Sequence, residues 1–467
     1  MVSETRPIII AGAGPCGLVT ALVLQNHGIP FLILEKTSRS KLCSDTGAGF
    51  DLAPTALNIL IHRLGLSKER IDETLSRYER WYIATIHGDL VKDEGTPQSA
   101  LEDCACTHRS ALQQALLDQL LQNATTEETE FLKCNSSLEY YQEEEDQVKA
   151  VMNDGSILVG KALLGCDGIN SKVRSCMNEH REDPLQYLGT MCYWGKCPRE
   201  EVEKYSSAHK SNSSTFVWLL GTNKVPGSLF ITPSNGTYRY LWFLSVPSGK
   251  PLSGTLDDLT RRGGAVLSEM AKTELLNTLD ENGALDPVLK TVISGTPAGE
   301  ITEAGLFDRV NLDLPFSSPR KLVALLGDSA HPQSPYLGQG TNCAITDAYF
   351  LATKLAGVSA QEAITYYDSD QRREEMKNLI EKARQQGNFL NSKNRFECWI
   401  LRTILRYAPI DVDELKRYDF SNKNMLSRLD GIKAKSSDGG AMTKPILIAA
   451  FVVAVFAIGL RMFLQYW

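Results

Sequence analysis

The chain has 467 residues, of which 43% are hydrophobic and 22% are charged, and its formal net charge is −7. This composition excludes a disordered chain and allows a large core divided over two structural domains. The acidic balance leaves no basic surface for nucleic acid, so we expect no nucleic-acid partner. Eleven cysteines, an odd number without regular spacing, indicate reduced thiols rather than a disulfide framework.

The first predicted element is a strand followed by a glycine-rich turn and a helix. Residues 8–11 form a short apolar run that is typical of a strand buried on both faces. Gly12, Gly14 and Gly17 follow as G-x-G-x-x-G, and a helical pattern runs on to Gly28. The pattern predicts a tight turn at Gly12, room for a pyrophosphate at Gly14 and close helix packing at Gly17. Phosphates are then expected at the positive end of the helix.

A second strand, residues 31–34, leads to Glu35 and Lys36. Glu35 follows Gly17 by 18 residues, close to the spacing of roughly 20 residues at which a carboxylate holds ribose hydroxyls. Such a carboxylate would repel a 2′-phosphate, which argues against NADP here. The alternative is an ordinary strand–helix–strand unit whose glycines serve packing alone. The motif favours a dinucleotide site but does not separate NAD from FAD.

Short strands and helices follow. A glycine-rich turn containing Gly49 precedes a helix from about Pro54, and residues 78–93 read as strands with a turn at Gly88-Asp89. Cys104 and Cys106 lie close together, but no second pair or histidine cluster accompanies them, so no metal site is predicted.

The next helix is expected to begin near Arg109, with Thr107 as its N-cap. A hairpin that turns at residues 153–155 leads to a buried strand ending at Cys166, directly before Asp167.

Residues 180–300 alternate aromatic and smaller residues between turns, which predicts an antiparallel sheet, with two helices after it. Alternation alone does not say which face of such a sheet meets a ligand. The aromatic candidates for a pocket wall, with core packing as the alternative for each, are Trp218, Phe230, Tyr238, Tyr240 and Trp242.

Residues 321–357 return to the pattern of a buried strand, a glycine-rich loop and a helix. Asp328 and Asp167 each stand beside a glycine at the carboxyl end of a predicted strand, and open α/β sheets bind ligands at that edge. The segment 338–342 begins a helix and offers backbone N–H groups to a carbonyl or an anion. Each loop alone reads as a turn, but together they can hold one extended ligand.

The C-terminal part begins with a charged helical region over residues 358–430 and a linker over 431–445. Residues 446–464 are 19 residues whose one charge is Arg461, close to the length that crosses about 30 Å of hydrocarbon. Lysines at 433, 435 and 444 predict a cytosolic globular part. We therefore expect a single-pass C-terminal membrane anchor, with an apolar helix docked on the protein as the alternative.

The segments 12–35, 165–174 and 327–342, in this order, resemble the class A flavoprotein monooxygenases, of the para-hydroxybenzoate and salicylate hydroxylase kind. The resemblance extends over roughly residues 6–390. It implies FAD rather than NAD at the N-terminal motif, and it implies NADPH as a co-substrate that binds transiently, since no second G-x-G-x-x-G occurs. Cys166 and Thr346 depart from the family pattern, where alanine and glutamate are usual.

The resemblance also assigns roles to individual residues. Glu35 would hold the adenosine ribose, and Arg109 matches an arginine at a helix start that contacts the cofactor. Asp328 matches the aspartate that binds the ribityl chain, and Asp167 matches one linked to both FAD and NADPH. The cofactor-binding candidates are Gly12, Gly14, Gly17, Glu35, Lys36, Gly49, Arg109, Asp167, Asp328, Gly340 and Thr341.

No catalytic residue is assigned, because the resemblance leaves the hard chemistry to the cofactor. Pro335 and Tyr336 are candidates for positions near the substrate, and His331 reads as structural.

The fold expected is α/β, a Rossmann-like FAD-binding domain interrupted by a β-sheet substrate domain, followed by helices and a transmembrane helix. The expected boundaries are 1–178 and 301–357 for the two parts of the FAD-binding domain, with substrate-side strands near 78–104, and 179–300 for the substrate domain.

The resemblance implies a monooxygenase that uses FAD, NAD(P)H and O₂, through a flavin C4a-hydroperoxide, to hydroxylate a lipophilic aromatic or polyketide-like small molecule. Two alternatives stay open: an epoxidase of an isoprenoid olefin, and a membrane-tethered flavin-binding protein without turnover.

Overall fold

A computed structural model describes residues 6–44, 47–77, 80–85, 90–93, 104–178, 183–198, 200, 215–220, 228–234, 239–247, 250–281, 287–309, 313–392, 394, 399–400, 403, 406 and 419–431. The chain divides into two units, Met1–Leu426 and Ser427–Trp467. Of the second unit, residues 427–431 are described, which contain the end of helix α18 (Phe420–Leu429).

A five-stranded parallel sheet carries the nucleotide-type segments, in the order β19-β12-β1-β2-β8. Its strands are β1 (Ile8–Ala11), β2 (Phe31–Leu34), β8 (Leu132–Lys133), β12 (Ala162–Gly165) and β19 (Val323–Leu325). Every neighbouring pair is parallel. All residues of β1, β12 and β19 are buried, as expected for strands covered on both faces. The predicted N-terminal strand–helix–strand unit is therefore confirmed.

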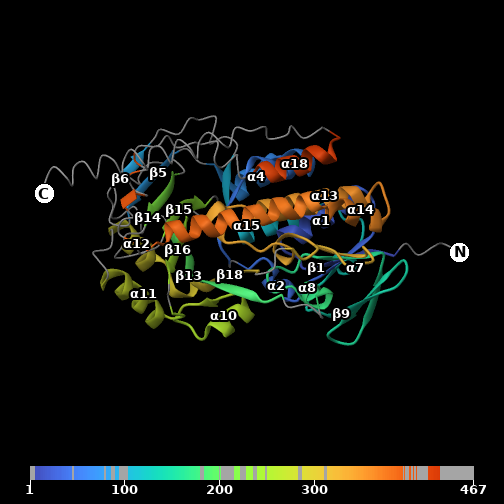
Figure 1. The fold of residues 1–467 in the computed structure, drawn as a ribbon, viewed down its shortest axis with the longest axis horizontal. Coiled ribbons are helices and arrows are strands. Elements are labelled where there is room, and N and C mark those ends of the chain that lie inside the picture. Colours follow the sequence, from blue (N-terminus) through green and yellow to red (C-terminus); the bar gives the residue numbers. More distant parts are fainter. Residues whose placement is uncertain are drawn as a thin grey trace. The chain divides into compact units, whose positions relative to one another are not determined.

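Three helices pack beside this sheet: α1 (Pro15–Asn26), α6 (Arg109–Gln122) and α13 (Gly340–Leu355). Helix α1 contacts both α6 and α13, and its residues 16–24 are all buried. The long helix α15 (Asp370–Leu390) runs near α13 (Figure 1) and is bonded to it through Arg372 and Asp347. Because β1, β12 and β19 are neighbours and parallel, their carboxyl ends meet at one edge, where residues 12, 166 and 326 follow.

The antiparallel sheet expected in residues 180–300 is an eight-stranded sheet, in the order β17-β18-β13-β16-β15-β14-β5-β6. Its strands are β5 (Arg80–Thr85), β6 (Leu90–Asp93), β13 (Leu185–Pro198), β14 (Thr215–Leu220), β15 (Ser228–Ser234), β16 (Arg239–Pro247), β17 (Ala265–Val266) and β18 (Thr302–Arg309). The sheet thus takes in strands from before residue 180 and after residue 300. The pair β14–β5 is parallel, and the other pairs are antiparallel.

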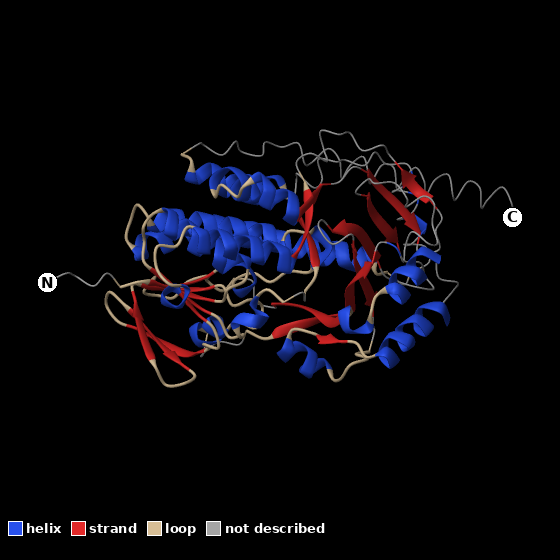
Figure 2. Cartoon of the chain, turned by 180° about the vertical axis from the view of Figure 1, so that it is seen from behind, coloured by secondary structure: helices blue, strands red, loops and turns tan. Residues whose placement is uncertain are grey.

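Helices cover one face of this sheet, here called the helix-covered face (Figure 2). They are α10 (Leu256–Arg262), α11 (Glu269–Glu281) and α12 (Pro287–Gly295). Tyr193, Tyr240 and Trp242 lie in the buried cluster beneath them. Two of the predicted pocket-wall residues, Tyr240 and Trp242, therefore belong to the core. Tyr238 and the side chains of Trp218 and Phe230 lie outside what the structure describes.

The remaining elements connect the two large sheets. Two small sheets have the orders β3-β7-β4 and β11-β10-β9. The elements are α2 (Arg39–Leu42), β3 (Gly49–Leu52), α3 (Pro54–Asn58), the π-helix η1 (Ile59–Arg63), α4 (Lys68–Thr74), β4 (Leu75–Arg77), β7 (Ala105–His108), α7 (Glu128–Phe131), β9 (Leu138–Glu143), β10 (Val148–Met152), β11 (Ile157–Gly160), α8 (Lys172–Met177), the 3₁₀ turns η3 (Ala298–Glu300), η4 (Gly327–Ser329) and η5 (Pro335–Leu337), and α14 (Ala360–Tyr367).

The predicted helix at Arg109 begins at that residue, but its N-cap is His108 rather than Thr107. The His108 ring accepts a hydrogen bond from the Ser110 N–H at 3.3 Å, whereas the Thr107 hydroxyl donates to the carbonyl of Thr74 at 2.9 Å. Strand β7 thus continues one residue further than its sequence suggests, because Thr107 pairs with Phe50 across the small sheet. The hairpin β10–β11 turns where predicted, with Gly155 at φ 82°. The turn predicted at residues 88–89 lies outside the described residues.

No helix within the described ranges combines the length and the apolar character that crossing a membrane requires. The segment 446–464, for which the sequence predicts an anchor, lies outside those ranges.

Candidate functional site

The glycine-rich turn between β1 and α1 is shaped by its neighbours. Gly12 has φ 102°, and a Cβ there would lie 2.5 Å from the carbonyl oxygen of Cys166. A Cβ at Gly17 would lie 2.0 Å from the carbonyl oxygen of Gly12. These two positions therefore accept glycine alone. At Gly14, by contrast, a Cβ would have no described atom within 4 Å beyond its chain neighbours, and the backbone is extended at φ −72°. Gly14 thus faces open space at the N-terminus of α1.

Glu35 stands at the end of β2 and is fixed by its own chain. Its Oε2 accepts a hydrogen bond from the Ala13 N–H at 2.9 Å, and its Oε1 accepts from the N–H and hydroxyl of Thr37 at 2.8 and 2.9 Å. The side chain is therefore held beside the glycine-rich turn. Carboxylate oxygens accept about two hydrogen bonds each, so Oε2 retains capacity for a further donor. Lys36 is exposed.

Asp167 follows β12 and caps helix α8. Its Oδ2 accepts from the Lys172 N–H at 2.8 Å and the Val173 N–H at 3.2 Å. Its Oδ1 is buried, and no residue in the described ranges bonds to it. Burial raises the pKa of Asp167, while hydrogen bonds from Ser171 and the α8 backbone lower it in part. A buried carboxylate oxygen without a donor is the kind of group that a ligand hydroxyl or amide would satisfy.

Asp328 lies in η4, the turn after β19, and faces the start of α13. Its side chain is accessible to water, yet surrounding protein raises the pKa of its carboxyl, an effect that His331 offsets in part. A Cβ placed on Gly340 would lie 3.8 Å from Asp328 Oδ1. Gly340 and Thr341 are the first two residues of α13. An accessible carboxylate therefore stands beside free N–H groups of a helix start.

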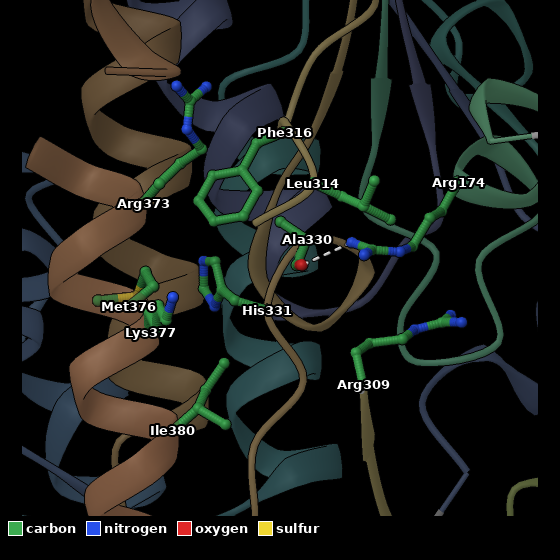
Figure 3. Close-up of a pocket in the computed structure, with 10 residues that line it drawn as sticks. All are labelled: Arg174, Arg309, Leu314, Phe316, Ala330, His331, Arg373, Met376, Lys377 and Ile380. Atoms are coloured by element: carbon green, nitrogen blue, oxygen red, sulfur yellow. Dashed lines mark hydrogen bonds between the residues drawn. The ribbon is translucent and has the colours of Figure 1, made fainter. Parts of the chain in front are cut away.

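The turn that carries Asp328 is followed by Ala330 and His331, and Figure 3 shows these two residues beside Arg174 and Phe316. Arg174 donates to the carbonyl of Ala330 at 2.6 Å. The His331 ring contacts Asp347 Oδ2 through Nε2 at 2.6 Å and packs edge-on against Phe316. His331 is 2% exposed. Both contacts fix the turn, and they give His331 the structural place that its sequence context predicts.

Three further candidate positions are Gly49, Arg109 and Pro335. A Cβ at Gly49 would lie 2.7 Å from Leu241 Cδ1, so this strand end packs on β16. The Arg109 N–H donates to the carbonyl of Ala48 at 3.1 Å, and its side chain is exposed. Pro335 is exposed at the start of η5.

Tyr336 is turned toward α15 rather than left open. Its hydroxyl accepts from Asn391 Nδ2 at 2.5 Å, and its ring lies against Gly387. Asn391 Oδ1 in turn accepts from the Ser245 hydroxyl at 3.0 Å. Tyr336 therefore links η5 to β16 and α15, and Pro335 is the member of the predicted pair that remains accessible.

The roles of two side chains in this site were missed from the sequence. Gln113, one turn into α6, donates to the carbonyl of Ala13 at 2.7 Å and so supports the glycine-rich turn. Asn342 accepts from the Ala53 N–H at 2.8 Å and donates to the carbonyls of Asp51 and Gly338 at 3.0 and 2.7 Å. A polar side chain on the inner side of a helix start is the signal that could have identified both.

The residues present fit a long flavin nucleotide. Gly14 leaves space at a helix N-terminus for a pyrophosphate, Glu35 keeps acceptor capacity beside it, and Asp328 offers an accessible carboxylate at the second helix start. The unsatisfied Oδ1 of Asp167 belongs to the loop after β12, the strand that lies between β1 and β19.

Comparison with known proteins agrees with this geometry. A family model described as "FAD binding domain" matches residues 5–261 and 316–382. The 3-amino-4-hydroxybenzoate 2-monooxygenase of Streptomyces cremeus is 26% identical, with 79% of this chain and 84% of that protein covered. The Aurachin C monooxygenase/isomerase of Stigmatella aurantiaca is 25% identical, with 86% and 94% covered.

Solved structures share the fold. HpxO of Klebsiella pneumoniae, complexed with FAD and uric acid, superposes with a TM-score of 0.70 at 19% identity over 90% of this chain and 97% of that chain. A salicylate hydroxylase substrate complex gives 0.67 at 19% identity over 93% and 100%.

Proposed function

Since this chain belongs to the FAD-binding domain family, as a class A flavin monooxygenase, we propose that it hydroxylates a lipophilic aromatic or polyketide-like small molecule with NADPH and O₂. It is an FAD-dependent monooxygenase. The observation that carries the proposal is the meeting of three polar loops at the carboxyl edge of one parallel sheet, after β1, β12 and β19. Several relatives are fungal FAD-dependent monooxygenases, and we extend the proposal to a role in secondary metabolism.

Each loop has a role in holding the cofactor under this proposal. The α1 N-terminus at Gly14 binds the pyrophosphate, and Glu35 accepts hydrogen bonds from the adenosine ribose. Asp328 accepts from the ribityl hydroxyls. Backbone N–H groups of Gly340 and Thr341, at the start of α13, would hold the isoalloxazine ring. Arg109, Lys36, Gly49 and Asp167 complete the set of cofactor contacts.

When bound, FAD supplies the redox and oxygen-activating chemistry, and the chain orients it and excludes water. Glu35 is prepared for this by its bonds to Ala13 and Thr37, which fix the carboxylate before a ligand arrives. Pro335 is exposed at the start of η5, and under this proposal it would meet the substrate.

We predict that FAD-loaded protein oxidises NADPH faster when a hydroxylatable aromatic compound is added, because substrate binding commits the enzyme to turnover. The measurement follows NADPH absorbance across a compound panel and analyses products after reaction under isotopically labelled O₂. Product carrying one labelled oxygen on an aromatic carbon is expected. A labelled epoxide would assign the epoxidase alternative instead, and bound FAD that NADPH does not reduce would refute the proposal.

We also propose that residues 446–464 anchor the chain in a membrane, because these 19 residues, if they form a helix, would span about 28 Å at about 1.5 Å each. Truncation after Gly440 is expected to move the chain from the membrane fraction to the supernatant while FAD content per chain is unchanged. The check is fractionation by ultracentrifugation of both forms. A truncated chain that still sediments with membranes would contradict the anchor.

A further inference from the structure

One pair of aromatic residues interrupts a buried face of the eight-stranded sheet. Cross-strand partners lie on the same face, and Tyr193 and Trp242 identify the helix-covered face. The alternate positions Trp194 and Phe243 are paired with each other on the opposite face. Both are half-buried. The pairs on either side of them along the strands are buried, and these are Lys196 with Leu241 and Cys192 with Ser245.

The buried pairs are those that contact the cofactor-binding part of the chain. Leu241 packs on Gly49 of β3, and Ser245 bonds to Asn391, which holds Tyr336 of η5. Trp194 and Phe243 therefore occupy the interval between these two contacts. That interval is flanked by the strand with Gly49 and the turn with Pro335.

The indole N–H of Trp194 is buried, and within the described ranges it has no hydrogen-bond partner. Trp242, which lies on the helix-covered face, instead has a partner, because its Nε1 donates to the Thr296 hydroxyl at 2.9 Å. A buried donor without an acceptor costs free energy, and a ligand that brings an acceptor would recover that free energy. The two tryptophans thus differ in one respect: Trp242 is satisfied by the fold and Trp194 is not.

We propose that the Trp194 N–H donates a hydrogen bond to an oxygen of the substrate, with the Phe243 ring against the substrate's plane. The substrate class is then an aromatic compound that carries a carbonyl or hydroxyl oxygen, rather than a plain hydrocarbon or olefin. Because the N–H edge is sheltered in the free chain, the indole turns about χ2, a broad torsion, when the substrate enters. This inference rests on the proposed function and names the substrate of the same site.

The first test compares Trp194→Phe with Trp242→Phe in FAD-loaded, full-length protein. Trp242→Phe removes a satisfied hydrogen bond from the core and is expected to lower Tm. Trp194→Phe removes a similar part of the ring but an unsatisfied donor, so its Tm is expected to fall less than that of Trp242→Phe. A Tm that falls as far in Trp194→Phe as in Trp242→Phe would show that the Trp194 N–H is already bonded within the fold, and it would overturn the proposal.

The second test uses two probe pairs that differ by one oxygen, namely 4-quinolone with quinoline and 1-naphthol with naphthalene. Binding is followed by the flavin absorbance change, and turnover by NADPH oxidation. Loss of one hydrogen bond predicts that Trp194→Phe raises Kd and KM for the oxygen-bearing probes about tenfold, with no change for their oxygen-free partners. Trp242→Phe is expected to leave both unchanged.

Three results would overturn the inference: equal Kd values of wild type and Trp194→Phe for the oxygen-bearing probes, stimulation by the oxygen-free probes alone, or stimulation by neither. Each is scored in protein whose FAD content and reduction by NADPH have been measured first. If FAD does not bind, or NADPH does not reduce it, the proposed function fails. If both occur and one of the three results follows, the substrate inference fails alone.

Discussion

The Gly14→Val variant is expected to fold and yet to lose FAD. The position has extended backbone at φ −72°, so a β-branched residue is sterically allowed, and no described atom lies within 4 Å of its Cβ beyond chain neighbours. The added side chain fills the space proposed for the pyrophosphate. Loss of two charge-assisted hydrogen bonds, at about 1.5–3 kcal/mol each, corresponds to at least about 100-fold weaker FAD binding. Stability falls by about 1 kcal/mol or less, through poorer helix capping.

Two other glycines serve as controls for this prediction. Gly299 is exposed, has no described atom near its Cβ position and lies in η3, away from the sheet edge. Gly299→Val should therefore keep full FAD affinity. Gly17→Ala should fail to fold, since its Cβ would lie 2.0 Å from the carbonyl oxygen of Gly12. Titration of apoprotein with FAD, alongside thermal unfolding, measures all three, and Gly14→Val with wild-type affinity would refute the placement of the pyrophosphate.

The Arg372→Met variant is expected to lose about 3–5 kcal/mol of unfolding free energy, the usual cost of breaking a buried ion pair. The side chains of Arg372 and Asp347 are both 0% exposed, and Arg372 Nη2 donates to Asp347 Oδ1 at 2.6 Å. Burial raises the pKa of Asp347, but Arg372 and His331 outweigh it and hold that pKa well below its usual range. Without Arg372 the carboxylate would remain as a buried charge with less compensation.

The effect should extend to the cofactor site, because Asp347 Oδ2 also accepts from the Gly327 N–H at 3.1 Å, next to Asp328. Lys377→Met on the same helix is the matched control. Lys377 pairs with Asp313 at 2.8 Å, but the Asp313 side chain is 78% exposed, so the cost should be about 1 kcal/mol or less. Denaturant unfolding of both variants measures the difference. If the unfolding free energy of Arg372→Met lay within about 1 kcal/mol of that of Lys377→Met, the role assigned to the buried pair would be contradicted.

The sequence predicts the nucleotide-type part well because its signals are local. A few adjacent residues are enough to predict each of three features: the turn at Gly12, the carboxylate at Glu35 and the helix start at Gly340. Their meeting at one edge also follows, because parallel strands present their carboxyl ends together.

The eight-stranded sheet shows where such inference stops. The alternation that the sequence shows around Tyr240 and Trp242 is that of a strand. Which face these residues occupy depends on α10–α12, which come later in the chain and cover that face. The sequence predicts Thr107 as the N-cap of α6, but the N-cap is His108, because Thr107 belongs to β7, which pairs with β3. The local pattern around residue 107 contains no sign of that pairing. Tyr336 is directed by Asn391 and Ser245, more than 50 residues away in sequence.

A crystal structure of the FAD complex tests the central claim most directly. One FAD per chain is expected, with ribose hydroxyls of the adenosine within about 3 Å of the Glu35 carboxylate, the pyrophosphate over Gly14, ribityl hydroxyls on Asp328 and the flavin ring at Gly340 and Thr341. FAD bound elsewhere, or a complex in which Glu35 and Asp328 both leave the nucleotide untouched, would contradict the account.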